Sequence, residues 1–210
     1  LPQSLTAIDG YAFCSCTSLK EIEIPGGVKT LGNDAFNVCT ALETVVMNSG
    51  TTNLSEAAFV GCTSLKNITL PDTLTYIGRR VFEDCSALEE VVLPNSVTKI
   101  CFEAFRNCKA LAEINFPLSW AEAPTRHGNY SGPDYQGQIF TGCTNLKKIT
   151  VPAGVTKIPD CAFSYCSYLE EVVIPSTVKT IGTNAFYGCS KLKSIEIPSG
   201  VTEITDYLFH

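Results

Sequence analysis

The sequence predicts an α/β solenoid, a rod of stacked coils in which each coil adds one parallel β-strand and a short helical turn. Phenylalanine, cysteine and leucine each return at a fixed step of 23 residues, with a single step of 35. The phenylalanine column is Phe13, Phe36, Phe59, Phe82, Phe105, Phe140, Phe163, Phe186 and Phe209. The cysteine column is Cys16, Cys39, Cys62, Cys85, Cys108, Cys143, Cys166 and Cys189. The leucine column is Leu19, Leu42, Leu65, Leu88, Leu111, Leu146, Leu169 and Leu192. Such a repeat indicates a solenoid, because stacked like residues form a continuous core that no single repeat can form alone.

The strand of each coil is the first element that the repeat predicts. In residues 19–25, apolar and polar side chains alternate toward the end, which is the period of a half-buried strand. Pro25 then closes the strand, because proline lacks the N–H donor that a ladder needs. Proline recurs at this position in most repeats, and Asn48 takes its place in the third.

The rest of the coil returns the chain to the next strand. Val28 and Leu31 supply two more inward side chains, which a second short strand would provide. Residues 32–34 read Gly-Asn-Asp, the chemistry of a turn and of a helix N-cap. Ala35, Phe36 and Cys39 then have the spacing that places side chains on one face of a single helical turn.

The columns define nine repeats, the last incomplete, and predict a single domain over residues 1–210. The chain starts and stops inside a repeat, so we expect it to be a fragment of a longer chain, with any signal or anchor outside it. The coils at residues 5–8 and 201–204 expose apolar edges at the two ends of the stack. We therefore expect a monomer or weak end-to-end association.

Composition argues against several classes of partner. The net charge is -6, with 15 Lys and Arg against 21 Asp and Glu, so the chain lacks the basic surplus that nucleic acid or anionic lipid attracts. No run of 18 apolar residues is present, so we expect no membrane insertion. The charged fraction of 17% predicts extensive burial rather than disorder.

Neither the motifs nor the cysteines indicate an enzyme. The sequence holds only two histidines, His127 and His210, and neither a phosphate-binding G-x-x-x-x-G-K-[ST] loop nor a G-x-S-x-G elbow. We expect no catalytic residues, no metal site and no cofactor. The 11 cysteines could form disulfides, but their fixed place beside phenylalanine and leucine favours a column of buried thiols. Neighbouring coils bring Cα atoms within disulfide range, so spacing alone leaves cross-links open.

The step of 35 holds 12 residues more than the repeat needs, within a bulge at about 121–134 that is rich in Gly, Pro, Ser and Asn. Loops inserted into solenoids tend to lie on one face, often the binding face. Its candidate contact residues are Arg126, His127, Tyr130, Trp120 and Tyr135. The first three have no repeat position to fill. Trp120 falls in the valine column and Tyr135 in the isoleucine column, so either ring could instead plug the core.

The outward positions of the strands form the other candidate surface. One column runs Glu21, Thr44, Asn67, Glu90, Glu113, Lys148, Glu171 and Ser194. The second runs Glu23, Val46, Thr69, Val92, Asn115, Thr150, Val173 and Glu196. The candidate contact residues are Glu90 and Glu113, acidic and central, with Val92 and Asn115 beside them. A merely solvated sheet face is the alternative, since single exposed valines are common.

The repeated pattern I/L-P-x-x-V-x-x-I-G-x-x-A-F-x-x-C-x-x-L-x-x-I/V, seen in residues 24–45, resembles the BspA-like, or Treponema-type, leucine-rich repeat. The resemblance implies a leucine-rich repeat right-handed superhelix. It also implies a bacterial cell-surface or secreted protein, since the family is known mainly from such proteins. The function it implies is non-catalytic adhesion or recognition of a protein or glycan ligand, for example on a host surface or matrix.

Two other functions stay open from the sequence. The chain could be a passive structural stalk that holds another domain away from the cell. It could also be an accessory domain of a larger enzyme. The repeat columns suit all three, because function depends on the site rather than on the fold.

Overall fold

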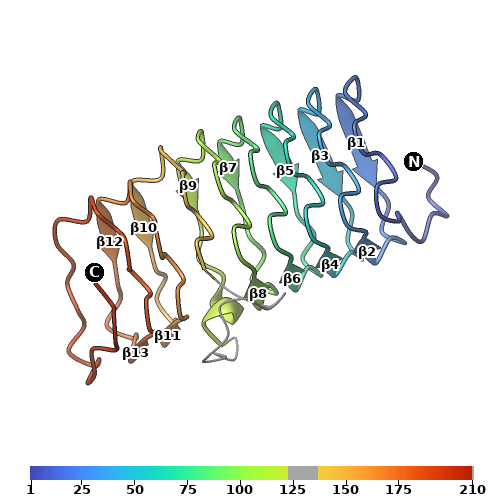
Figure 1. The fold of residues 1–210 in the computed structure, drawn as a ribbon. Helices are drawn as coiled ribbons and strands as arrows, with labels where there is room; N and C mark the ends of the chain where they lie inside the picture. The colour runs from blue at the N-terminus through green and yellow to red at the C-terminus, as the bar shows by residue number, and fades with distance from the viewer. Residues whose placement is uncertain (123–136, 210) are drawn as a thin grey trace.

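The computed structural model describes residues 1–122 and 137–209 and shows an elongated stack of coils. The coils follow one another from the N-terminal end to the C-terminal end, with two rows of short strands along the rod (Figure 1). All paired strands are parallel, and each pairs with its equivalent in the next coil. The predicted solenoid with one principal parallel strand per repeat is confirmed.

The first row, here called the first wall, contains the predicted strands. They are β1 (Glu21–Ile24), β3 (Thr44–Met47), β5 (Asn67–Thr69), β7 (Glu90–Val91), β9 (Glu113–Ile114), β10 (Lys148–Thr150) and β12 (Glu171–Val173). Within each pair the register equals the repeat, so that Ile22 lies opposite Val45 and Val45 opposite Ile68. Like residues therefore stack directly over one another, as the columns predict.

The second row, here called the second wall, confirms the second short strand in the coil. It consists of β2 (Thr30–Leu31), β4 (Asn53–Leu54), β6 (Tyr76–Ile77), β8 (Lys99–Ile100), β11 (Lys157–Ile158) and β13 (Thr180–Ile181). The second residue of each of these strands is buried and the first is partly or fully exposed. The order β2-β4-β6-β8 is unbroken, so four successive coils share one sheet here.

The predicted helical turn around each phenylalanine is wrong. Residues 32–38 form turns, and the helix that the structure does describe is a 3-10 helix, η1 (Leu118–Glu122). The backbone takes left-handed φ angles at Asp34 (55°) and Val38 (59°), on either side of Phe36. The amide N–H of Phe36 donates to the carbonyl of Ala58 in the next coil at 2.8 Å, whereas an α-helix would bond within its own coil.

The core is a single column of stacked aromatic rings lined by the cysteine and leucine columns. Consecutive phenylalanine rings from Phe13 to Phe209 lie 5.0–6.3 Å apart with interplanar angles of 4–22°. The stack continues across the insertion, where the Phe105 and Phe140 centroids are 5.6 Å apart. The phenylalanine, cysteine and leucine columns are buried from Phe36 to Leu169, as predicted, whereas Cys189 and Leu192 near the C-terminal end are half-buried.

Candidate functional site

The outward side chains of the first wall are exposed along its length. Thr44 is half-buried, and the other members of the two predicted columns are exposed. Three valines of the second column keep large apolar surfaces in solvent, with exposed fractions of 37% for Val46, 63% for Val92 and 40% for Val173. Val92, at the middle of the rod, is the most exposed of the three and directly follows β7.

The charge on the first wall is uneven. Glu90 lies opposite Glu113 in the parallel register of β7 and β9, and both are exposed. Toward the C-terminal end, Lys148 pairs with Glu171 at 2.7 Å between Nζ and Oε1. The two central carboxylates therefore form a local acidic spot beside Val92. As adjacent like charges they repel each other.

Asn115 has a structural task on the same wall. Its Nδ2 donates to the carbonyl of Leu93 at 2.7 Å, and its Oδ1 accepts from the N–H of Leu93 at 2.7 Å. The side chain thus takes the place of ladder hydrogen bonds just beyond β7 and β9. Of the predicted wall residues, Glu90, Glu113 and Val92 form one exposed group, and the Asn115 amide is largely occupied by the backbone.

The prediction of Trp120 as a contact residue is corrected by its position in the structure. Its side chain is 2% exposed and packs against Phe116 and Phe163, with ring centroids 4.8 and 6.2 Å away. The indole fills the valine position of its coil and lies against Phe116, two residues beyond β9 (Glu113–Ile114). Trp120 therefore plugs the core and does not face a ligand. The other predicted contact residues of the insertion, Arg126, His127, Tyr130 and Tyr135, lie outside the described residues.

The column cysteines are thiols that hydrogen-bond between coils. In six of the eight column cysteines, Sγ donates to the carbonyl of a phenylalanine in the preceding coil, at 3.0–3.2 Å. The pairs are Cys39 with Phe13, Cys62 with Phe36, Cys85 with Phe59, Cys108 with Phe82, Cys143 with Phe105, and Cys189 with Phe163. Burial raises the pKa of Cys39 to about 11 and those of Cys143 and Cys189 to about 12. These thiols stay protonated at neutral pH, so they are poor nucleophiles and poor metal ligands.

A cluster of charges joins two coils in the turns around Phe82 and Phe105. Glu83, with 5% of its side chain exposed, accepts from Arg80 Nε and lies 3.3 Å from Arg106, which also contacts Glu103 at 2.9 Å. Burial alone would lower the pKa of Arg80, but the hydrogen bond and charge of Glu83 outweigh it and raise that pKa. Each acid has a basic partner, so the cluster stabilises the stack. Within residues 1–122 and 137–209, no group of three or more potential ligands could hold a metal ion.

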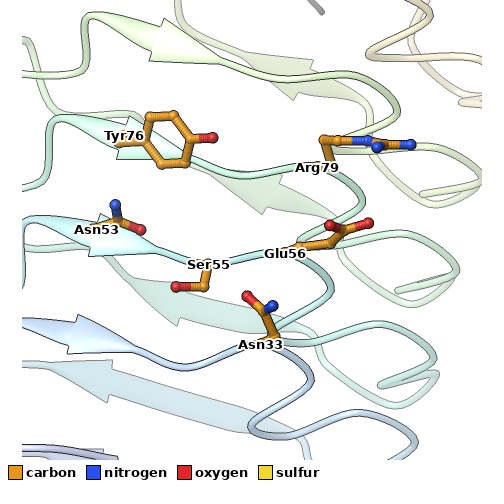
Figure 2. A pocket seen from close by; sticks show the side chains of 6 residues that line it. All are labelled: Asn33, Asn53, Ser55, Glu56, Tyr76 and Arg79. Atoms are coloured by element: carbon orange, nitrogen blue, oxygen red, sulfur yellow. The ribbon is translucent and has the colours of Figure 1, made fainter. Parts of the chain in front are cut away.

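The second wall carries a polar pocket that the sequence did not predict. Its volume is about 250 Å³, and Figure 2 shows the six side chains around it. They are Asn33, Asn53, Ser55, Glu56, Tyr76 and Arg79, from three successive coils. The column of residue 55 holds glycine in the neighbouring coils, at Gly32 and Gly78, and this small column leaves a hollow between two rows of larger polar side chains.

A signal for this pocket was present in the third repeat. Asn48 stands where other repeats have proline, Thr51 where they have valine or another apolar residue, and Ser55 where both adjacent repeats have glycine. Thr51 is fully buried and donates from Oγ1 to the carbonyl of Val28 at 2.7 Å. Departures from the repeat pattern therefore collect in the coil that forms the middle of the pocket.

Solved structures of several bacterial proteins are similar to this chain. A leucine-rich repeat protein of T. pallidum is similar at 27% sequence identity and a TM-score of 0.66, over 89% of this chain and 82% of that one. A leucine-rich repeat protein of Bacteroides ovatus matches at 24% identity and a TM-score of 0.44, over 94% and 71% of the two chains. A leucine-rich cell surface protein of Faecalibacterium prausnitzii matches at 23% identity and a TM-score of 0.40, over 98% and 74%. No curated protein matches the sequence.

The described helix is far too short to cross a membrane, and no other described segment is a candidate span. The family model described as the BspA type leucine-rich repeat region matches six copies of its repeat, over residues 1–125 and 135–210. These residues contain the strands, the turns and the buried columns described above. The chain therefore belongs to the BspA type leucine-rich repeat family, a family of repeat proteins that generally serve in protein interaction or structural roles.

Proposed function

We propose that this chain is a non-catalytic binding module that presents the centre of its first wall to a protein ligand at the bacterial cell surface or after secretion. The observation that carries the proposal is the group formed by Glu90, Glu113 and Val92. Val92 is 63% exposed on a rigid strand row, next to two carboxylates in register. Stacked coils fix these side chains relative to one another, so little conformational entropy is lost when they bind.

The chemistry of this group favours a particular kind of ligand. A partner segment with an apolar side chain flanked by Lys or Arg would cover Val92 and pair with the two carboxylates. Complementary charge at the rim raises the association rate and makes binding sensitive to salt. An apolar contact at the centre contributes more to affinity, because it is shielded from water in the complex.

Several observations support a non-catalytic role. Burial raises the pKa of the column thiols, so they are held as neutral groups away from solvent. The charged cluster around Glu83 is internally paired. The outward residues of the first wall are mostly simple Glu, Thr, Asn and Val, which suit contact better than chemistry.

A binding screen against purified host matrix proteins and glycans tests the proposal, followed by variants of the wall. We expect a protein ligand to emerge whose binding weakens about tenfold or more in Val92→Ser. Charge reversal with Glu90→Lys and Glu113→Lys should slow association and reverse its salt dependence. Val38→Ser is the matched control, because Val38 is 41% exposed but lies on the turn row away from the wall.

Two outcomes would overturn the wall as the contact site. Normal binding by the wall variants, combined with loss of binding when residues 123–134 are removed, would assign the contact to the insertion. Failure of the whole screen would favour a structural stalk. Fractionation of the source cells tests location separately, and an intracellular pool would contradict the surface role.

A further inference from the structure

The pocket on the second wall is built from two polar rows with a shallow floor between them. Asn53 and Tyr76 begin the adjacent strands β4 and β6, and Arg79 and Glu56 lie on the turn row beside them (Figure 2). In Figure 2, Asn53 and Tyr76 lie on one side of the pocket and Arg79 and Glu56 on the other, with Ser55 between them. The pocket is therefore a feature of three stacked coils and not of one flexible loop.

The next coil supports the two largest side chains from one side. The ammonium of Lys99 lies 5.4 Å from the ring centroid of Tyr76, and the guanidinium carbon of Arg79 lies 5.8 Å from that of Phe102. In the sheet, β8 lies on one side of β6 and β4 on the other. Lys99 and Phe102 belong to the coil of β8, so both contacts reach Tyr76 and Arg79 from the C-terminal side. Tyr76 and Arg79 are thus held in place while the pocket lies toward β4. Pre-orientation of this kind lowers the entropy lost on binding.

Two polar atoms at the pocket lack partners within the protein. Asn53 Oδ1 and Arg79 Nε are shielded from solvent and make no hydrogen bond in the part of the chain that the structure describes. One is an acceptor and the other a donor, and leaving such groups unpaired costs free energy. A side-chain movement that exposes either atom would let a ligand hydroxyl pair with it, because a hydroxyl both donates and accepts.

We propose that this pocket is a saccharide-binding subsite that takes a single neutral hexopyranose residue. Adjacent hydroxyls of a sugar ring donate and accept together, which matches the planar amide of Asn53, the guanidinium of Arg79 and the carboxylate of Glu56. The Tyr76 ring offers an apolar face to the C–H groups of the sugar. The volume of about 250 Å³ accommodates one sugar ring rather than an extended chain.

The charges at the pocket exclude the simpler alternatives. Glu56 disfavours a phosphate or other dianion beside Arg79, because the Glu56 carboxylate would repel the dianion. A purely cationic ligand would in turn be repelled by Arg79. Neutral hydroxyls pair with both side chains without a net charge of their own. The pocket lies on the second wall and the group around Val92 on the first, so the proposed protein-binding function does not use the pocket residues.

Saturation-transfer difference NMR on the intact chain tests the subsite, with the methyl glycosides of glucose, galactose, mannose and N-acetylglucosamine as probes at millimolar concentration. We expect at least one glycoside to bind. Its affinity should fall about tenfold or more in Tyr76→Ala and in Arg79→Ala, since each removes one recognition element. Thr180→Ala and Thr183→Ala are the matched controls, because these residues occupy the same two repeat positions outside the pocket.

Thermal melts of every variant show that it remains folded. Absence of binding by all four glycosides would overturn the proposal, and so would binding that survives both pocket variants. Displacement of the glycoside by free amino acids at lower concentration would reassign the pocket to a zwitterion and overturn the saccharide class. Val92→Ser should leave glycoside binding unchanged, which separates this test from that of the first wall.

Discussion

Each cysteine of the repeated column combines two properties that few side chains offer together. It packs as a small apolar group, and its thiol donates to a phenylalanine carbonyl in the preceding coil. Those carbonyls lie in the turns, where each also accepts the backbone N–H of the cysteine three residues on, as Phe59 does from Cys62 at 3.2 Å. Alanine would fill the space without donating, and serine would donate with a shorter and more polar group.

Cys85→Ala should therefore destabilise the chain by about 1–3 kcal/mol, because the buried carbonyl of Phe59 loses one of its two donors and the core loses the packed sulfur. Urea denaturation followed by circular dichroism measures the change. Cys14→Ala is the control, since Cys14 is half-buried and outside the column. We expect its effect to stay within about 0.5 kcal/mol. Equal effects of the two substitutions would show that the thiol ladder adds nothing.

Alkaline pH should weaken the folded state through the same thiols. Burial raises the pKa of Cys143 and Cys189 from an ordinary value of 9.0 to about 12. Below pH 9 the thiols are protonated in both states, and above it the unfolded chain loses protons that the folded chain keeps. Stability should fall progressively from pH 9 toward pH 12. The urea concentration at the midpoint of unfolding, measured across this pH range, checks the prediction. A midpoint that does not change with pH would contradict the assigned burial.

Thiol titration checks the redox state of the column. Few of the 11 cysteines should react with a thiol reagent at neutral pH in the folded chain, because the thiolate is the reactive form. Close to all should react after denaturation without a reductant. Denaturation that releases only a few thiols would show that the column is cross-linked by disulfides.

The elements of the coil differ in how well the sequence predicts them. The strands of the first wall follow from alternation and from the proline that ends them. The turn around Phe36 did not follow, because the spacing of Ala35, Phe36 and Cys39 fits a helical turn and the observed turn equally well. Glycine at Gly61, Gly142 and Gly188, two residues after a phenylalanine, was the available signal for left-handed backbone there.

The candidate site was predicted unevenly for a similar physical reason. Val92 and the two glutamates were found because period-two alternation tells which strand residues point outward. The pocket at Asn53 and Tyr76 was missed because it depends on how three coils differ from one another. A repeat pattern describes what the coils share. The sequence left open whether Trp120 lies in the core or on the surface. Its packing against Phe116, which only the structure shows, places it in the core.

The charged cluster should contribute to the coupling of the coils. Glu83→Gln should destabilise the chain by about 1–3 kcal/mol, since a buried carboxylate that accepts from Arg80 is lost. The arginines are 43% and 41% exposed, so water compensates part of the loss. Glu89→Gln on the exposed surface is the matched control and should change stability by less than about 0.5 kcal/mol. If Glu83→Gln leaves the stability of the chain unchanged, the cluster contributes nothing to the coupling of the coils.

At the scale of the whole molecule, the insertion should be dispensable for folding. Removing the 12 residues 123–134 restores the step between Phe105 and Phe140 to 23, and the two rings are already stacked at 5.6 Å. The shortened chain should keep its circular dichroism spectrum and unfold cooperatively. Trp120→Ala, in contrast, should cost about 3–5 kcal/mol, because it empties a core position. A deletion variant that unfolds would make the insertion part of the core.

The continuity of the rod depends most on the turns at that insertion, because strand pairing of both walls stops there and the turns carry the described backbone hydrogen bonds across it. Native-state hydrogen exchange by NMR tests it at matched amides. Phe82 and Asp84 donate to Ala104 and Arg106 in the next coil, and across the insertion Phe105 and Asn107 donate to Ile139 and Thr141 at 2.9 and 2.8 Å. We predict that all four amides are protected to a similar degree. Fast exchange of Phe105 and Asn107 beside slow exchange of Phe82 and Asp84 would mean that the rod is two separate stacks, and would contradict the account.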